Sequence, residues 1–236
     1  MIEGVVFDWG GTLTLPIEVI YEIDTWGDVA RHLDPENHEE LVVRLGAIEA
    51  ELWEISRTTQ KSAHLEDLIA AVVREFGIEM AEDSLRYATG HHLDAIRPHI
   101  EHDPDAAGVL RGLRERGLAI GLLSNTLWPE DFHERLLEDA GIRDLIDVRL
   151  YTSHMEVTKP HPQAFRAALD ALGIQDAAHA VFVGDRPYDD IHGARRAGFK
   201  TVHRPNEMVP PHDVEPDAVI PDLPSLIRVI DEWIGG

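Results

Sequence analysis

The 236-residue sequence contains no cysteine and only three lysines, at positions 61, 159 and 200. The absence of cysteine excludes disulfide bonds, thiolate nucleophiles and cysteine-bound zinc. Any catalytic chemistry must therefore use oxygen and nitrogen groups. Because lysine is so rare, each of the three can be considered separately, and arginine supplies most of the positive charge.

Long hydrophobic runs and basic charge are also scarce. No apolar run approaches the ~20 residues that are needed to span a bilayer. The 44 acidic residues outnumber the 21 lysines and arginines, and the formal net charge of -23 argues against nucleic acid as a partner. The opening MIEGVVFDWGG lacks the basic flank and apolar centre of a secretory signal. We therefore expect a cytoplasmic protein with no membrane span, and the sequence leaves its oligomeric state open.

Two hydrophobic patterns divide the chain. Residues 4–7 form a short, largely β-branched run before a Gly-rich turn, which predicts a buried strand. Residues 17–96 instead place apolar side chains at three- and four-residue spacing, as in 38–55 and 63–77, and this spacing predicts helices. Beyond Pro98, predicted strands and helices alternate.

The alternating part of the chain indicates the fold class. The predicted strands lie at 118–125, 148–153, 180–185, 200–204 and 218–222, and the predicted helices at 105–117, 131–141, 161–173, 188–198 and 225–234. Short apolar strands separated by amphipathic helices are typical of a parallel sheet that is covered on both faces. We predict an α/β fold, a doubly wound parallel sheet with an α-helical cap inserted after the first strand. Residues 1–16 and 97–236 would form the core, and residues 17–96 the cap.

Polar residues stand near the carboxyl ends of the predicted strands, where doubly wound sheets bind their ligands. They are Asp8 in VVFDWGGTLT, Ser124 and Asn125 in IGLLSNT, Lys159 in EVTKPHPQAF, and Asp185 and Asp190 in VFVGDRPYDD. A carboxylate can attack phosphorus directly and form an acyl phosphate that water later opens. Several carboxylates beside a dianionic phosphate require a cation between them, and Mg²⁺ suits such an oxygen-rich site.

In order and local context, these four segments resemble the four motifs of the haloacid dehalogenase-like superfamily. The resemblance spans residues 4–198 and is closest to the helical-cap branch (subfamily I), which includes phosphoglycolate phosphatase-like proteins. It implies that Asp8 is the nucleophile and that Ser124 and Lys159 take part in catalysis.

The resemblance also implies the ligand-binding residues. Ser124, Asn125 and Lys159 would bind the phosphate group of a small phosphorylated substrate, and Asn125 would also shape its loop. Mg²⁺ would be held by Asp8, the Gly10 carbonyl, Asp185 and Asp190, with Asp189 as the competitor of Asp190.

Gly10 is the main departure from the family pattern. Phosphatases of this family normally have an aspartate two residues after the nucleophile, which serves as general acid and base. Loss of such a group typically lowers the rate by ~10²–10⁴.

Three interpretations of Gly10 remain open. The favoured one is a Mg²⁺-dependent phosphatase that acts through an aspartyl-phosphate intermediate, either on an easy leaving group or with a replacement acid such as Glu18, His154 or a cap residue. The second is a 2-haloacid dehalogenase or a phosphonatase-like enzyme, for which Lys61 is the candidate Schiff-base lysine in the cap. The third is a weakly catalytic or non-catalytic protein that binds phosphate and metal. The sequence does not identify the substrate.

Overall fold

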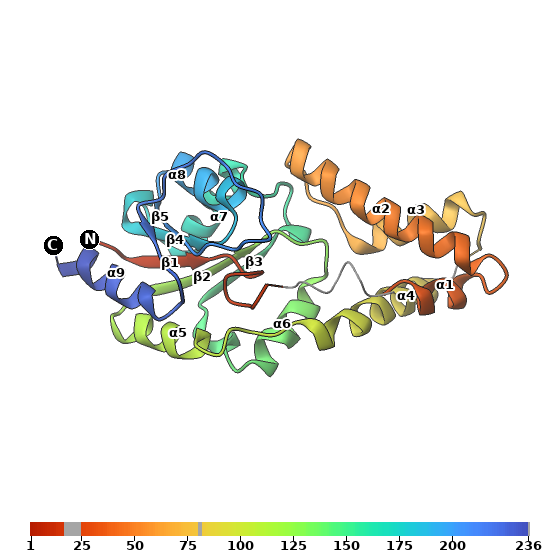
Figure 1. Ribbon diagram of the computed structural model, residues 1–236, viewed down its shortest axis with the longest axis horizontal. Helices are drawn as coiled ribbons and strands as arrows, with labels where there is room; N and C mark the ends of the chain where they lie inside the picture. Colours follow the sequence, from red (N-terminus) through yellow and green to blue (C-terminus); the bar gives the residue numbers. More distant parts are fainter. Residues whose placement is uncertain (17–24, 80–81, 236) are drawn as a thin grey trace.

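The computed structural model describes residues 1–16, 25–79 and 82–235. It has two lobes, a sheet with helices on both faces and a separate group of helices (Figure 1). Glu18, one of the candidate replacement acids, lies outside the described residues.

Six parallel strands form the sheet in the order β3-β2-β1-β4-β5-β6. Their bounds are β1 (Gly4–Phe7), β2 (Ala119–Ser124), β3 (Val148–Tyr151), β4 (Ala180–Gly184), β5 (Lys200–His203) and β6 (Ala218–Val219). β1 lies at the centre, where Phe7 pairs with Leu122 of β2 and with Val183 of β4. The predicted doubly wound parallel sheet is confirmed. β6 is shorter than the predicted strand because Pro221, which lacks a backbone N–H, cannot extend the ladder.

Helices cover both faces of the sheet (Figure 1). α7 (Pro162–Leu172) and α8 (Gly193–Ala197) lie on one face, and α5 (Ala106–Glu115), α6 (Glu130–Asp139) and α9 (Ser225–Gly235) on the other. Short 3₁₀ turns occur at Arg97–His99, Arg143–Leu145, Thr152–His154 and Ala177–His179.

The continuous apolar run of β1 is explained by this double cover. Val5 and Phe7 belong to the hydrophobic cluster that includes α5, α6 and α9. Val6 points the other way and packs in a second cluster with Phe165 of α7 and Phe182 of β4. Because successive side chains of a strand face opposite sides, a strand that is buried on both faces has no polar positions.

The helical segment between β1 and α5 forms the second lobe. Its helices are α1 (Gly27–Leu33), α2 (His38–Thr59), α3 (Leu65–Glu75) and α4 (Glu82–Ile96). α1 packs against α2 and α4, and α3 packs against the same two helices. No helix among the described residues is long and apolar enough to cross a membrane.

One predicted helix has an unexpected form. The segment predicted as a helix at 188–198 begins as a π-helix over Pro187–His192 and continues as α8. The wider turn is visible in the backbone, because both Asp190 N–H (2.9 Å) and Ile191 N–H (3.3 Å) donate to the carbonyl of Arg186. π-helical turns are frequent at functional sites because they change the direction of a side chain.

Candidate active site

The carboxyl ends of three neighbouring strands bring the predicted site residues together. Asp8 follows β1, Ser124 is the last residue of β2, and Asp185 follows β4. The Asp8 N–H donates to the Val183 carbonyl at 2.9 Å, so the backbone of Asp8 still belongs to the sheet ladder. All three side chains therefore lie at one edge of a rigid sheet, and all three are buried.

Lys159 links two of the predicted acids. Its Nζ donates to Asp8 Oδ1 and to Asp190 Oδ1, each at 2.6 Å. The lysine is only 1% exposed and Asp190 is fully buried. A buried ammonium group that is shared by two carboxylates holds both in place and offsets part of their charge.

Asn125 fixes the backbone of Lys159. Its Nδ2 donates to the Lys159 carbonyl at 3.0 Å, and its Oδ1 accepts from the Lys159 N–H at 2.9 Å. The amide thus contacts both polar backbone groups of the lysine, in the manner of a short strand pair. This geometry gives Asn125 a positioning role, and its predicted contact with phosphate stays a prediction.

Asp8, Asp185 and Asp190 form a compact acidic cluster. One carboxylate oxygen from each lies within 4.8 Å of those of the other two. Asp185 Oδ2 accepts from Asn206 Nδ2 at 2.8 Å, whereas the buried Asp185 Oδ1 has no hydrogen-bond partner within the part of the chain that the structure describes. Three converging carboxylates and an unpartnered buried oxygen suit a hard divalent cation such as Mg²⁺.

The pKa shifts within the cluster also favour a bound cation. Burial raises the pKa of Asp8 from 3.8 to about 6, although Lys159 opposes the shift. Burial and then repulsion from Asp8 and Asp190 raise the pKa of Asp185 to about 7. Burial alone would lower the pKa of Lys159, but the two carboxylates on it raise that pKa and keep it charged. The protein alone does not neutralise its three acids, so a bound cation would stabilise their ionised forms.

Two glycines allow the acids to approach the backbone this closely. Gly11 has a φ of +74°, and a Cβ built on it would lie 2.3 Å from Asp185 Oδ2. A Cβ on Gly184 would lie 2.4 Å from the Asp190 carboxylate. These positions exclude any side chain, which explains why glycine flanks both motifs.

The alternative candidates that the sequence offered lie outside the acidic cluster. Asp190 joins the cluster, while Asp189 lies 3.9 Å from Arg186 and is outside it. His154 is exposed beside His64 of the helical lobe, with 6.5 Å between the ring centroids. A Cβ on Gly10 would meet nothing within 4 Å, so there is open space at the position of the usual acid.

Two residues near the cluster were not predicted from the sequence. Asn206 lies beyond β5 and binds Asp185, and the rule that ligands gather at strand ends could have indicated it. Arg186 directly follows Asp185, and the surrounding acids, Asp185 and Asp189 foremost, raise its pKa despite the opposing effect of burial. Just over half of the side chain (54%) is exposed to solvent, although its charged end lies among these acids.

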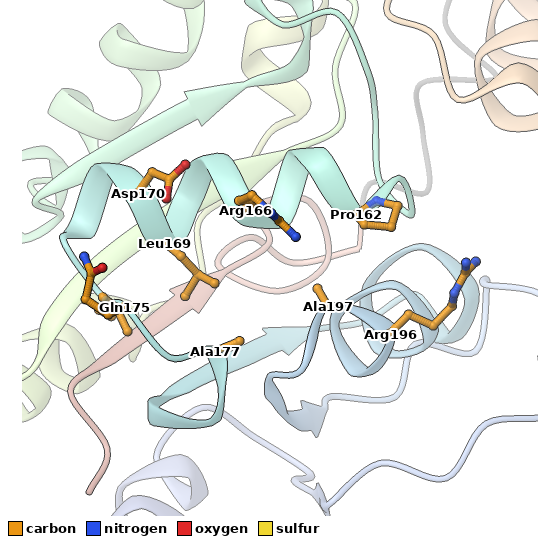
Figure 2. Close-up of a pocket in the computed structure, with 9 residues that line it drawn as sticks. Pro162, Arg166, Leu169, Asp170, Gln175, Ala177, Arg196 and Ala197 are labelled. Atoms are coloured by element: carbon orange, nitrogen blue, oxygen red, sulfur yellow. The ribbon is translucent and has the colours of Figure 1, made fainter.

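A cavity of about 360 Å³ lies elsewhere, between α7 and α8. Figure 2 shows its lining residues, which include Arg166 and Asp170 of α7 and Arg196 of α8. None of the predicted site residues lines this cavity. It is therefore separate from the acidic cluster.

A profile of a hydrolase family, the haloacid dehalogenase-like hydrolases, matches residues 2–198. The chain belongs to this family. The match confirms the resemblance that the four motifs indicated, and it includes every residue of the acidic cluster together with Lys159.

Curated relatives of this haloacid dehalogenase-like hydrolase include several phosphatases. A phosphoserine phosphatase of Thermus thermophilus is 35% identical over 121 residues, which are 51% of this chain and 47% of that protein. A glyceraldehyde 3-phosphate phosphatase of Methanopyrus kandleri is 30% identical over 166 residues, or 68% of this chain and 70% of that protein. The chain spans about half the length of most of the curated relatives it matches.

Solved structures of the family share the fold. A 2-haloacid dehalogenase of Pseudomonas syringae matches with a TM-score of 0.71 and 23% identity, over 99% of this chain and 100% of that one. At this identity the likeness establishes the fold alone. The chain thus belongs to a family of hydrolases, and its curated relatives are named as phosphatases and as a haloacetate dehalogenase.

Proposed function

We propose that the protein is a Mg²⁺-dependent phosphatase that hydrolyses a small phosphorylated metabolite through an aspartyl-phosphate on Asp8, with residues 17–96 as its cap. The observation that carries the proposal is the buried cluster of Asp8, Asp185 and Asp190, in which Lys159 bridges two of the acids and one acidic oxygen has no partner among the described residues. A dehalogenase has no need of the two further acids, whereas a phosphatase needs them to hold its metal. The phosphatase names among the relatives support the same choice.

Asp8 is suited to attack phosphorus. Lys159 occupies its Oδ1, and within the described residues no group donates to Oδ2, which is left for the substrate. The Oδ2 lone pair would form a bond to phosphorus while the ester P–O bond breaks and its electron pair leaves with the alkoxide. Water would then open the acyl phosphate, which regenerates the carboxylate. Bound Mg²⁺ would supply positive charge for the phosphoryl oxygens.

The remaining residues bind and orient. Lys159 would keep Asp8 ionised and share its charge with the phosphoryl group, and Asn125 would hold the lysine backbone. The Ser124 hydroxyl, at the end of β2, would donate to a phosphate oxygen. Asp185, Asp190 and the Gly10 carbonyl would complete the metal site with Asp8.

The test is phosphate release from a panel of phosphorylated metabolites with Mg²⁺ and with EDTA. We expect turnover that EDTA abolishes, an acid-stable phosphoenzyme that hydroxylamine cleaves, and loss of both in Asp8→Asn. Retention of turnover in Asp8→Asn would contradict the proposal.

A dehalogenase is the second candidate, and Gly10 is the observation that favours it. Halide departure needs no general acid, and the open space at Gly10 offers none. Halide release from 2-haloacids that persists in EDTA and is lost in Asp8→Asn would identify this activity. Binding of Mg²⁺ and inorganic phosphate without turnover on either panel would instead indicate a binding protein.

A further inference from the structure

The segment that follows β5 holds Asp185 at two points. The Arg204 N–H donates to the Gly184 carbonyl at 3.0 Å, so this segment continues the ladder beside β4. His203 Nε2 donates to the Asp185 carbonyl at 3.1 Å, and Asn206 Nδ2 donates to Asp185 Oδ2 at 2.8 Å. Both the backbone and the side chain of Asp185 are therefore fixed by residues 203–206.

Asn206 leaves one oxygen of Asp185 for a metal ion. It binds Oδ2, and the buried Oδ1 has no partner among the residues that the structure describes. The loop after β1 lies against the same hydrogen bond, because a Cβ built on Gly11 would lie 2.3 Å from Asp185 Oδ2 and 3.0 Å from Asn206 Nδ2. The carboxylate is thus held between Asn206 and the Gly11 backbone in one orientation.

Arg204, in the same segment, contacts both linkers between the core and the helical lobe. The first linker is residues 9–16, after β1, and the second is residues 100–105, before α5. Arg204 Nη1 donates to the Thr12 carbonyl of the first linker at 2.5 Å, and Nη2 donates to Asp103 Oδ2 of the second at 2.6 Å. The Arg204 and Asp103 side chains are only 13% and 8% exposed. One guanidinium therefore joins two segments that the whole helical lobe separates in the sequence.

The two linkers also pair with each other. Thr14 and His102 form an antiparallel bridge. Backbone hydrogen bonds of 2.9 Å lie on either side of it, from Leu15 N–H to the carbonyl of residue 101 and from the N–H of residue 103 to the carbonyl of residue 13. An isolated two-stranded pairing is only marginally stable in water. Arg204 supplies the contact that ties this pairing to the sheet.

We propose that Arg204 and Asn206 are positioning residues that couple metal binding to the pairing of the two linkers. Asn206 orients Asp185 for the cation, and Arg204, two residues earlier, holds the linkers. The coupled element has two states, with the linkers paired or unpaired. Because a coupling free energy is reciprocal, a cation that fixes Asp185 also favours the paired linkers. The inference rests on the metal site of the proposed function and adds a link from that site to the helical lobe.

The experiment combines Mg²⁺ titration calorimetry with hydrogen exchange of peptides that cover residues 13–16 and 101–103, with and without Mg²⁺. The proteins are the wild type, Arg204→Met, Arg204→Lys, Asn206→Ala and the control Arg116→Met. Arg116 is the matched control, because it also donates to one carboxylate (Asp231) and one backbone carbonyl (Gly112). It lies at the end of α5 that is farther from the second linker.

We expect saturating Mg²⁺ to slow exchange of both linker peptides about fivefold in the wild type. Asn206→Ala should raise the Kd for Mg²⁺ about tenfold, and saturating Mg²⁺ should no longer slow the linkers. Arg204→Met should speed linker exchange about tenfold without metal and raise the Kd about fivefold. Arg204→Lys keeps one positive charge but not the two-pronged contact, and its effects should be intermediate. Arg116→Met should match the wild type in both measurements.

Two results would overturn the coupling. One is faster linker exchange in Arg204→Met with an unchanged Kd for Mg²⁺, and the other is linker exchange in the wild type that does not respond to saturating Mg²⁺. If Arg204→Met does not fold, Arg204→Lys and Asn206→Ala provide the same comparison. Coupling without phosphate release would refute the phosphatase proposal alone, and phosphate release without coupling would refute this inference alone. A wild type that does not bind Mg²⁺ would refute both.

Discussion

Replacement of Lys159 by methionine tests the charge balance of the buried cluster. The lysine is 1% exposed and its Nζ lies 2.6 Å from one oxygen each of Asp8 and Asp190. Without it, three carboxylates within 4.8 Å of one another lose the buried ammonium group that two of them share. Removal of one partner from a buried ion pair costs about 3–5 kcal/mol, and we expect a loss of that size in the free energy of unfolding at pH 8 without Mg²⁺.

The loss in the free energy of unfolding should depend on pH and on the presence of Asp190. Because the pKa values of Asp8 and Asp185 already lie at about 6 and about 7, both acids can take up protons at pH 5, and the substitution should cost less there. Addition of Asp190→Asn to Lys159→Met removes one of the stranded charges and should recover part of the stability. The single and double variants together form a double-mutant cycle.

Urea unfolding followed by tryptophan fluorescence measures these differences, since the chain has five tryptophans. Lys200→Met serves as the control, because this lysine lies on β5 beside Trp233 and away from the cluster. A loss below about 1 kcal/mol at pH 8, or an equal loss at pH 5 and pH 8, would refute the charge-balance reasoning.

Three further predictions concern the same cluster. Without divalent metal, the wild type should lose stability from about pH 4 to pH 7, because the folded cluster holds protons that the unfolded carboxyls have released, and Mg²⁺ should reverse this loss in thermal melts. Gly10→Asp has room for its side chain and should raise kcat on phosphate esters by about 10²-fold or more; an intact fold with no gain would contradict a missing general acid. Gly184→Ala should displace Asp190 and lower both activity and Mg²⁺ affinity at least tenfold, whereas Gly46→Ala, with open space around it, should not.

The sequence was most informative where chemistry follows directly from topology. Buried apolar strands predicted a parallel sheet, and parallel strands place Asp8, Ser124 and Asp185 at one edge. Lys159 was predicted from the order of the motifs, and no strand pattern marks it. Its place between Asp8 and Asp190 follows from a loop that the structure alone describes.

Other features of the site depend on contacts between distant segments, which spacing along the chain does not encode. Asn125 binds the backbone of Lys159, 34 residues away, and Asn206 binds Asp185 across 21 residues. The π-helix before α8 arises where two N–H groups share the Arg186 carbonyl, and periodicity alone predicts an ordinary helix there. The pairing of Lys61 with Val157 is equally invisible in the sequence, since a single bridge leaves no alternating pattern.

The net negative charge of the chain determines which groups the site needs in order to bind an anionic substrate. A net charge of -23 repels an anionic substrate, but salt screens this repulsion beyond about 8 Å, so binding depends on cations close to the substrate. Lys159 cannot serve alone, because three carboxylates against one ammonium leave the ionised cluster with two negative charges. A divalent cation would bring that sum to zero before phosphate arrives. Any second anionic group of the substrate must then be met by a further cation, and Arg186, which directly follows Asp185, is an exposed cation beside the cluster.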